Sequence, residues 1–322
     1  MSRINPITLQ NSQLRQGESV LKILWKSYKS LPIHSFFDES ELKNKKRFIF
    51  LIKAFHPFAL LQDFRFRKLL SDSKLQAYFD VNEDIAFQSI SLPAELVEAS
   101  ILNTQKYLNN KQKNDKSYFR ELTNLRDYEV NSPELQLATD PKLIKSVANY
   151  LDCSPVLLNI TAVHSPKSLA KESEVLSGSQ LFHRDADDTR ILKVWIFCSD
   201  VTNQTGPTVL INAKQSEEIA QSITYKQGSR ANDKSVIEEF SPELNSAIGP
   251  RGSQYATDTA RLLHYGSRTG ASADRLVLMF HYVSPYSQYT RLRLVNLLFI
   301  IKRKLHRRSL GPLNSYQSML LR

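Results

Sequence analysis

The stretch from Leu181 to Ile211 reads LFHRDADDTRILKVWIFCSDVTNQTGPTVLI. Its middle, Leu192–Phe197, is a short apolar run typical of a buried strand, and Asn203-Gln-Thr-Gly206-Pro is a turn signal. The stretch opens with His183-Arg184-Asp185. Because alternate residues of a strand point to one face, His183 and Asp185 would be presented together. They supply two of the three ligands of a facial triad, which binds Fe(II) and leaves positions open.

His-x-Asp alone fits a surface strand with two polar residues better than a metal site, so the wider sequence has to carry the hypothesis. The third ligand would be a histidine from a distant strand, and His264 is the candidate. Downstream, Arg275 opens the apolar run RLVLMFHYV. Its guanidinium could pair bidentately with a carboxylate of a cosubstrate. In the same run we expect His281 to be a packed histidine rather than a ligand.

Glycine placement divides the chain into two halves. Seven of the nine glycines lie between Gly178 and Gly270, and Gly17 is the only one before them. Since glycine serves tight turns, we predict a mostly helical first half and a second half of short strands. The expected helices are Gly17–Leu31, Ser40–Phe55, Phe58–Ser71, Pro93–Asn109, Ser117–Thr123 and Asp140–Leu151.

Apolar alternation and turn residues predict the strands. They are Val156–Val163, Gln180–Asp185, Leu192–Phe197, Thr208–Ile211, Tyr255–Thr257, Arg261–Tyr265 and Leu276–Val283. A polar, more helical insertion interrupts them between Ala213 and Phe240. Many short strands in a row favour a sandwich, barrel or jelly roll. The fold class expected is therefore α+β.

Charge is unevenly distributed. The chain of 322 residues has 43 Lys and Arg, 32 Asp and Glu and a formal net charge of +11. From Arg275 to Arg322 there are nine basic residues and no acidic one, so the remainder carries only +2. The basic character belongs to the tail, which lacks a recognisable nucleic-acid module, so we expect no nucleic-acid partner.

Composition also limits the cellular compartment and the kinds of metal site that we expect. Cys153 and Cys198 are too few for a disulfide framework or a four-thiolate zinc site. No apolar run follows the initial Met1-Ser-Arg, and none reaches the roughly 20 residues that span a bilayer. We therefore expect a cytoplasmic protein in a reducing compartment.

The wider string resembles the phytanoyl-CoA dioxygenase family of Fe(II)/2-oxoglutarate-dependent oxygenases, over about residues 133–283. The residues that carry the resemblance are His183, Asp185, Asp187, Asp188, Arg190, Leu192, Lys193, Ser199-Asp200-Val201, Gly206-Pro207, Asp258-Thr259, His264, Gly266 and Arg275. The resemblance implies a double-stranded β-helix, a cupin-like jelly roll, with a metal inside its mouth. We further expect a largely helical N-terminal region, as the glycine distribution predicts, to pack on this core.

Residue by residue, the resemblance implies these roles. His183, Asp185 and His264 fall on the metal triad, which is also the catalytic centre. Arg275 falls on the arginine that binds the distal carboxylate of 2-oxoglutarate. Trp195 falls on an aromatic position lining the cosubstrate site, and it shares a strand face with Lys193 and Phe197, so all three would face inward or none would. Ser267 lies one residue from a hydroxyl position that helps bind the cosubstrate.

The implied reaction uses Fe(II), O2 and 2-oxoglutarate, releases succinate and CO2, and abstracts hydrogen from a C–H bond of a small-molecule or lipid-like substrate. Asp185 favours hydroxylation or another hydrogen-abstraction outcome, because related halogenases lack that carboxylate. His264-Tyr265-Gly266 departs from the family's His-Arg-Gly, and Ile211–Ser216 replaces a Pro-Gly-Ser-His segment. Neither change removes a ligand, and both could alter the substrate side.

The expected organisation is a helical N-terminal region (1–132), an oxygenase core (133–285) and a basic, helical C-terminal segment (286–322). Apolar residues at helical spacing within 291–308 favour a helix docked on the protein, with peripheral contact to anionic lipid as the alternative. Two other functions stay open: a non-catalytic jelly-roll binding protein, and a peripheral membrane protein acting through its tail. The pattern indicates no particular oligomeric state.

Overall fold

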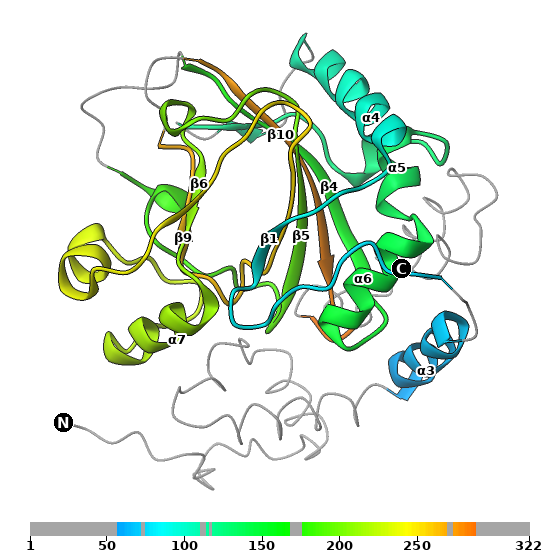
Figure 1. Ribbon diagram of the computed structural model, residues 1–322, viewed down its shortest axis with the longest axis horizontal. Helices are drawn as coiled ribbons and strands as arrows, with labels where there is room; N and C mark the ends of the chain where they lie inside the picture. The colour runs from blue at the N-terminus through cyan, green and yellow to red at the C-terminus, as the bar shows by residue number, and fades with distance from the viewer. Residues whose placement is uncertain are drawn as a thin grey trace, which may run out of the picture.

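The computed structural model describes residues 57–71, 75–109, 114–115, 118–167, 176–268 and 273–287. The helices expected at Gly17–Leu31 and Ser40–Phe55, and the C-terminal segment 291–308, lie outside these residues. Within them the chain is α+β, with two antiparallel sheets and several helices (Figure 1). No helix among the described residues is long and apolar enough to cross a membrane.

The larger sheet has seven strands in the order β1-β8-β5-β10-β4-β3-β2. These are β1 (Phe87–Ser89), β8 (Gln254–Thr257), β5 (Ile191–Phe197), β10 (Arg275–Val283), β4 (Val156–Ser165), β3 (Arg120–Glu121) and β2 (Asn114–Asp115). The smaller sheet has the order β7-β6-β9, with β7 (Asn245–Ala247), β6 (Thr208–Leu210) and β9 (His264–Tyr265). Strands from before and after residue 133 thus pair in one sheet.

Helices α4 (Ala94–Lys106), α5 (Pro133–Ala138) and α6 (Pro141–Leu151) lie along one side of the larger sheet, and the smaller sheet lies on the other (Figure 1). The remaining helices are α3 (Pro57–Ser71) and α7 (Ala213–Ser222). Short helical turns occur at Tyr107–Asn109, Leu125–Asp127, Gly178–Gln180, Asn203–Thr205 and, as a π-helical turn, Lys234–Glu238. The start of α6 confirms its predicted cap, because the Asp140 side chain accepts from the amides of Lys142 and Leu143.

Side chains alternate between the two faces of the central strands β5 and β10, and each face belongs to a different hydrophobic core. Leu192, Val194 and Ile196 of β5, with alternate residues of β10, pack against the helices. Trp195 and Phe197 face the smaller sheet and pack with Leu210 and other residues there. Each strand therefore buries both faces, one in a helix-covered core and one between the sheets.

Three local predictions are wrong. Ser117–Thr123 was expected to be helical, but Arg120 and Glu121 pair with β4 as strand β3. A seven-residue helix is marginal on its own, and the free edge of β4 offers backbone partners instead. Gln180–Asp185 is not a strand: Gln180 ends the helical turn Gly178–Gln180, and Phe182 and His183 form isolated bridges. Of the expected Arg261–Tyr265 strand, only His264–Tyr265 pairs regularly.

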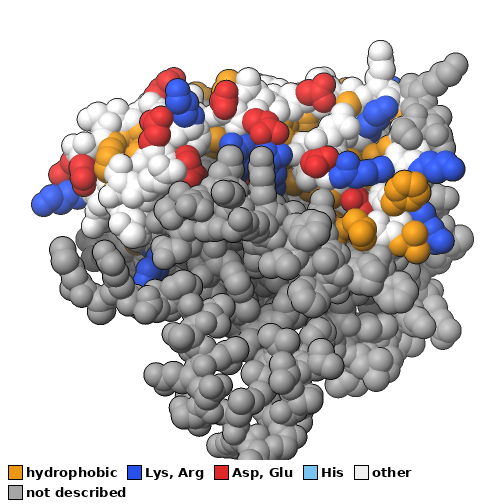
Figure 2. Space-filling view, turned by 90° about the horizontal axis from the view of Figure 1, so that it is seen from below, with side chains coloured by type: hydrophobic (Ala, Val, Ile, Leu, Met, Phe, Trp, Pro, Cys, Tyr) orange, Lys and Arg blue, Asp and Glu red, His pale blue; other side chains and the backbone are white. Residues whose placement is uncertain are grey.

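Helix α5 is not among the predicted helices, although the sequence carries its signal. The Ser132 hydroxyl accepts from the Leu135 amide, and Pro133 occupies the first turn. The insertion after Ala213 is helical in part, as predicted. On the described part of the face in Figure 2, acidic and basic side chains are interspersed, in keeping with the small net charge of the chain before Arg275.

Candidate metal centre

Backbone pairing brings the two predicted histidines side by side. The His183 amide donates to the His264 carbonyl at 2.9 Å, and the reverse bond is 3.0 Å. This isolated antiparallel bridge joins the segment after the Gly178–Gln180 turn to β9. Since directly opposite residues of an antiparallel pair project to the same side, the imidazoles meet, with ring centroids 4.2 Å apart.

Both imidazoles are oriented by backbone carbonyls. His183 Nδ1 lies 2.9 Å from the Leu181 carbonyl oxygen, and His264 Nδ1 lies 2.9 Å from that of Leu262. A proton on each Nδ1 satisfies these contacts and leaves Nε2 with a free lone pair. Burial lowers the pKa of His183 to about 3 and also lowers that of His264. Both rings are therefore neutral at pH 7, the form that binds a metal.

Asp185 completes the group. Its amide donates to the Thr259 carbonyl at 2.8 Å, which joins the segment after His183 to the segment before His264. Asp185 Oδ1 lies 3.7 Å from His183 Nε2, and one donor atom from each of His183, Asp185 and His264 lies within 4.8 Å of the others. Two neutral imidazoles and one carboxylate match the donor set of a facial triad. The residues present therefore fit a divalent metal with open coordination positions.

The second carboxylate oxygen of Asp185 is held by Lys193. Lys193 Nζ donates to Asp185 Oδ2 at 2.6 Å. Burial acts to raise the pKa of the Asp185 carboxyl, but the ammonium of Lys193, with smaller contributions from the histidines, sets it well below its usual range. Burial likewise acts to lower the pKa of Lys193, and Asp185 and Asp187 raise it. The pair is thus ionised, with Oδ1 left toward the histidines.

His281 extends this group on the neighbouring strand. It lies opposite Lys193 in the β10–β5 register, and its Nε2 is 3.5 Å from Asp187 Oδ2. Burial, and next to it the charge of Lys193, lowers the pKa of His281 to about 3. His281 is not among the residues whose donor atoms converge on the candidate metal position. It is packed beside the centre, in line with the prediction.

A loop after α7 is fastened to the His-x-Asp segment. Gln227 Nε2 donates to the Asp185 carbonyl at 2.5 Å and to the Ala260 carbonyl at 2.9 Å. The Tyr225 hydroxyl accepts from the Arg184 amide at 2.9 Å and donates to the Ser229 carbonyl at 2.8 Å. The sequence analysis missed these contacts, because nothing in the local pattern of the insertion marks Gln227 or Tyr225.

Arg275 is buried, with 6% of its surface exposed. Its Nη1 donates to the Gly206 carbonyl at 2.5 Å, and its Nη2 to the hydroxyls of Ser267 at 2.8 Å and Ser165 at 3.4 Å. Its Nε has no hydrogen-bond partner among the described residues, and burial lowers its pKa to about 10. Ser267 was a predicted site residue, whereas Ser165 was not.

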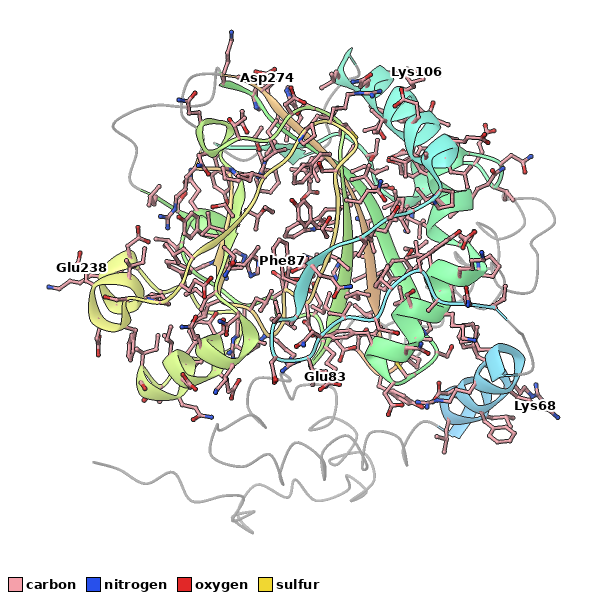
Figure 3. The ribbon with its side chains drawn as sticks, in the orientation of Figure 1. Lys68, Glu83, Phe87, Lys106, Glu238 and Asp274 are labelled. Carbon is pink, nitrogen blue, oxygen red and sulfur yellow. The ribbon has the colours of Figure 1, made fainter. Side chains whose placement is uncertain are left out.

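No carboxylate of the described residues forms an ion pair with Arg275. The adjacent Asp274 accepts instead from the Lys167 amide at 2.9 Å, and its Oδ2 lies 3.0 Å from His164 Nε2. Figure 3 shows Asp274 at the edge of the molecule, whereas Phe87 lies at its centre, between the sheets. A buried guanidinium without a counter-charge is costly, and an oxyanion would satisfy both its charge and its free Nε.

Trp195 lies on the face of β5 that looks toward the smaller sheet. It is buried between Lys193, which reaches Asp185, and Phe197. The prediction that these three residues share one orientation is confirmed, and the orientation is inward. Lys193 carried no assigned role in the sequence analysis, although its alternation with Trp195 was a signal that could have shown one.

Comparison with known proteins gives only distant structural likeness. No protein-family model matches the chain, and no curated protein matches it. Solved structures that it resembles include the non-heme alpha ketoglutarate dependent epimerase SnoN from nogalamycin biosynthesis, 13% identical over 62% of this chain and 79% of that chain, with a TM-score of 0.46.

Two others have similar values. EctD from S. alaskensis in its apoform is 13% identical over 62% of this chain and 74% of that chain, with a TM-score of 0.45. HygX from Streptomyces hygroscopicus with nickel and 2-oxoglutarate bound is 16% identical over 62% of this chain and 83% of that chain, with a TM-score of 0.43. Likeness at this level carries no inference about the site of this chain.

Proposed function

We propose that this chain is an Fe(II)- and 2-oxoglutarate-dependent dioxygenase that hydroxylates a small-molecule or lipid-like substrate. The proposal is carried by the donor atoms of His183, Asp185 and His264, which converge within 4.8 Å. A second feature supports it: Arg275 is buried without a described counter-charge. The first feature fits a metal with open positions, and the second fits a dicarboxylate cosubstrate.

In this proposal the core is a double-stranded β-helix, or jelly roll. Its support is the pair of antiparallel sheets that share the apolar cluster around Trp195 and Leu210. His264 lies on strand β9 of the smaller sheet and pairs with His183, and Asp185 is bonded by Lys193 of strand β5 in the larger sheet. Rigid strands on both sides would hold the ligands in place, as precise metal geometry requires.

His183, Asp185 and His264 would hold the iron, which supplies O2 activation coupled to the oxidative decarboxylation of 2-oxoglutarate to succinate and CO2. The rest of the chain binds and orients. Lys193 holds one oxygen of Asp185 and leaves the other free. Arg275 and the hydroxyl of Ser267 would bind the distal carboxylate of the cosubstrate. Trp195 and the surrounding apolar cluster would exclude water from the cosubstrate side.

The test is succinate formation by the full chain with 2-oxoglutarate and Fe(II) added anaerobically before exposure to O2. We expect activity in the wild type and loss of metal binding, measured directly by metal content, in His183→Ala. His164→Ala is the matched control, since His164 is also a buried histidine but pairs with Asp274. Full metal retention in His183→Ala would remove the site assignment.

A second candidate is a non-catalytic binding protein with the same core. It is favoured by one observation, the Lys193 ammonium at 2.6 Å from Asp185, which already neutralises the carboxylate without a metal. The two candidates differ in a simple measurement. The binding protein would take up no Fe(II) or Zn(II) at stoichiometric concentration, whereas the enzyme would take up one equivalent.

A further inference from the structure

Arg230 lies beside the candidate metal centre by backbone register. Ala231 forms an isolated antiparallel bridge with Phe182, and the Ala231 amide donates to the Phe182 carbonyl at 2.8 Å. One residue beyond His183, the Tyr225 hydroxyl joins the Arg184 amide to the Ser229 carbonyl. Between this connection and the bridge, Arg230 lies across from His183, as antiparallel register requires. His183 also pairs with His264 on its other side. Three neighbouring backbones thus place Arg230, His183 and His264 in one row.

Residues opposite one another in such a row project to the same side. The side chain of Arg230 is therefore expected on the face that carries the two imidazoles. The electrostatics agree with this placement. Burial is the main cause of the lowered pKa of both histidines, and the charge of Arg230 contributes to the lowering in each.

The guanidinium of Arg230 has no acidic partner among the described residues. Its Nη1 donates to the carbonyls of Gly228 at 2.9 Å and Ser229 at 3.1 Å, and no other described residue accepts from it. The acids around it are engaged elsewhere: Asp233 binds Arg268 through both oxygens, at 2.7 and 2.8 Å, and Asp185 binds Lys193. Arg230 is exposed, so this free cation is open to a solute.

The loop that carries Arg230 is held in position. Gln227 bonds the carbonyls of Asp185 and Ala260, and the Tyr225 hydroxyl joins the Arg184 amide to the Ser229 carbonyl. These contacts fasten the loop to the same segment that bears His183 and Asp185. The position of the loop backbone that bears Arg230 is therefore set by the fold before any ligand arrives, which favours specific binding.

We propose that Arg230 is the substrate-anchoring residue of this site and that it binds an oxyanion group, a carboxylate or a phosphate, on the substrate. This rests on the proposed function, since it names the substrate class of that site. Arg275 and Arg230 then bind different molecules. The buried guanidinium takes the cosubstrate, and the exposed one takes the acidic end of the substrate and directs a C–H bond at the metal.

The experiment titrates the full chain, loaded with Zn(II) and 2-oxoglutarate, with hexanoate, hexyl phosphate and hexanol, and measures binding by calorimetry. We expect hexanoate or hexyl phosphate, but not hexanol, to bind the wild type. The better of the two oxyanion probes identifies the chemical source. Arg230→Gln should weaken that binding roughly tenfold to a hundredfold, because a charge-assisted hydrogen bond is lost, and Arg230→Lys should retain part of it.

Arg251→Gln is the matched control. It removes an equal charge from an arginine that pairs with Glu98 at the surface, and it should leave probe binding unchanged. Equal oxyanion binding in wild type and Arg230→Gln, or no oxyanion binding to the wild type, overturns the proposal. Metal and 2-oxoglutarate binding are measured in the same Arg230→Gln sample. Metal binding should not be weakened, because the substitution removes a positive charge that acts on the two histidines. Arg230-dependent probe binding by a chain that takes up no metal would support the anion site and refute the oxygenase.

Discussion

The Lys193 ammonium lies 2.6 Å from Asp185 Oδ2, on the side of the carboxylate away from the oxygen nearest His183. Both side chains are largely shielded from solvent, with 13% and 19% of their surfaces exposed. The contact means that Asp185 can offer one oxygen to a metal while the other stays bonded to the protein. Lys193 is therefore a positioning residue for the carboxylate.

Replacing Lys193 by Met should destabilise the metal-free protein, because it leaves a mostly buried carboxylate without its partner. Since the pair retains some solvent contact, we expect a loss of roughly 2–3 kcal/mol, below that of a fully buried pair. A bound Zn(II) supplies a replacement positive charge. The rise in Tm on adding Zn(II) should then be larger in Lys193→Met than in the wild type, with Lys193→Arg in between. An equal rise in all three would contradict this role.

Arg275 should behave in the opposite way. The guanidinium is buried without a described counter-charge, which favours its removal, but Arg275→Met also leaves the Gly206 carbonyl without its donor. We therefore expect the free energy of unfolding of the ligand-free protein to change by about 1 kcal/mol or less. The same substitution should abolish the rise in Tm that 2-oxoglutarate produces in the Zn(II)-loaded wild type. Ser267→Ala should reduce that rise only in part, since it removes one of the hydrogen bonds to Nη2. Stabilisation of Arg275→Met by 2-oxoglutarate at wild-type concentrations would refute the assignment.

His281 predicts a pH dependence of stability. Its pKa is lowered to about 3 in the folded chain, whereas an unfolded histidine titrates near 6.5. Below that value the unfolded chain binds a proton that the folded chain does not, so stability falls as the pH falls from about 6.5 toward 3. The loss is up to about 1.4 kcal/mol per pH unit for each such histidine. His281→Gln should show a shallower slope in urea unfolding between pH 7 and pH 5. Equal slopes of stability against pH in His281→Gln and the wild type would contradict this role of His281.

Asp258 links the fold to the site. Its carboxylate is fully buried and accepts from the Tyr150 hydroxyl at 2.7 Å and from the amides of Ile191 at 3.2 Å and Ala260 at 3.0 Å. Asp258→Ala would strand three donors and should cost about 3 kcal/mol or more. Tyr150→Phe removes the bond to Asp258 and the longer one, at 3.4 Å, that the hydroxyl accepts from Arg261, and it should cost about 1 kcal/mol.

Asp258→Ala should also weaken Zn(II) binding, because the next residue, Thr259, accepts the hydrogen bond from the Asp185 amide. The measurement is calorimetric titration of both variants after their folding has been verified by circular dichroism. Wild-type metal affinity in a folded Asp258→Ala protein would show that this turn does not position the ligands.

The part of the site that depends on the alternation of side chains along the chain could be predicted from the sequence. His183 and Asp185 are two residues apart and share a side even though their segment is not a regular strand. Trp195 and Lys193 share the inward face of β5 for the same reason. What alternation could not supply was the length of each strand, which depends on whether a neighbouring edge is free. Within the helix predicted at Ser117–Thr123, Arg120 and Glu121 instead form strand β3, because the edge of β4 was available.

The sequence by itself determined which residues are chemically able to act: two histidines, one carboxylate, a cation at the head of β10, and apolar alternation that buries both faces of the central strands. Only the tertiary structure decided which of them meet. The pairing of His183 with His264, the contact of Lys193 with Asp185, and the position of Arg230 in the same row depend on register between segments far apart in the chain. Local sequence sets the side to which a residue points, whereas long-range packing and hydrogen bonding set what lies opposite it.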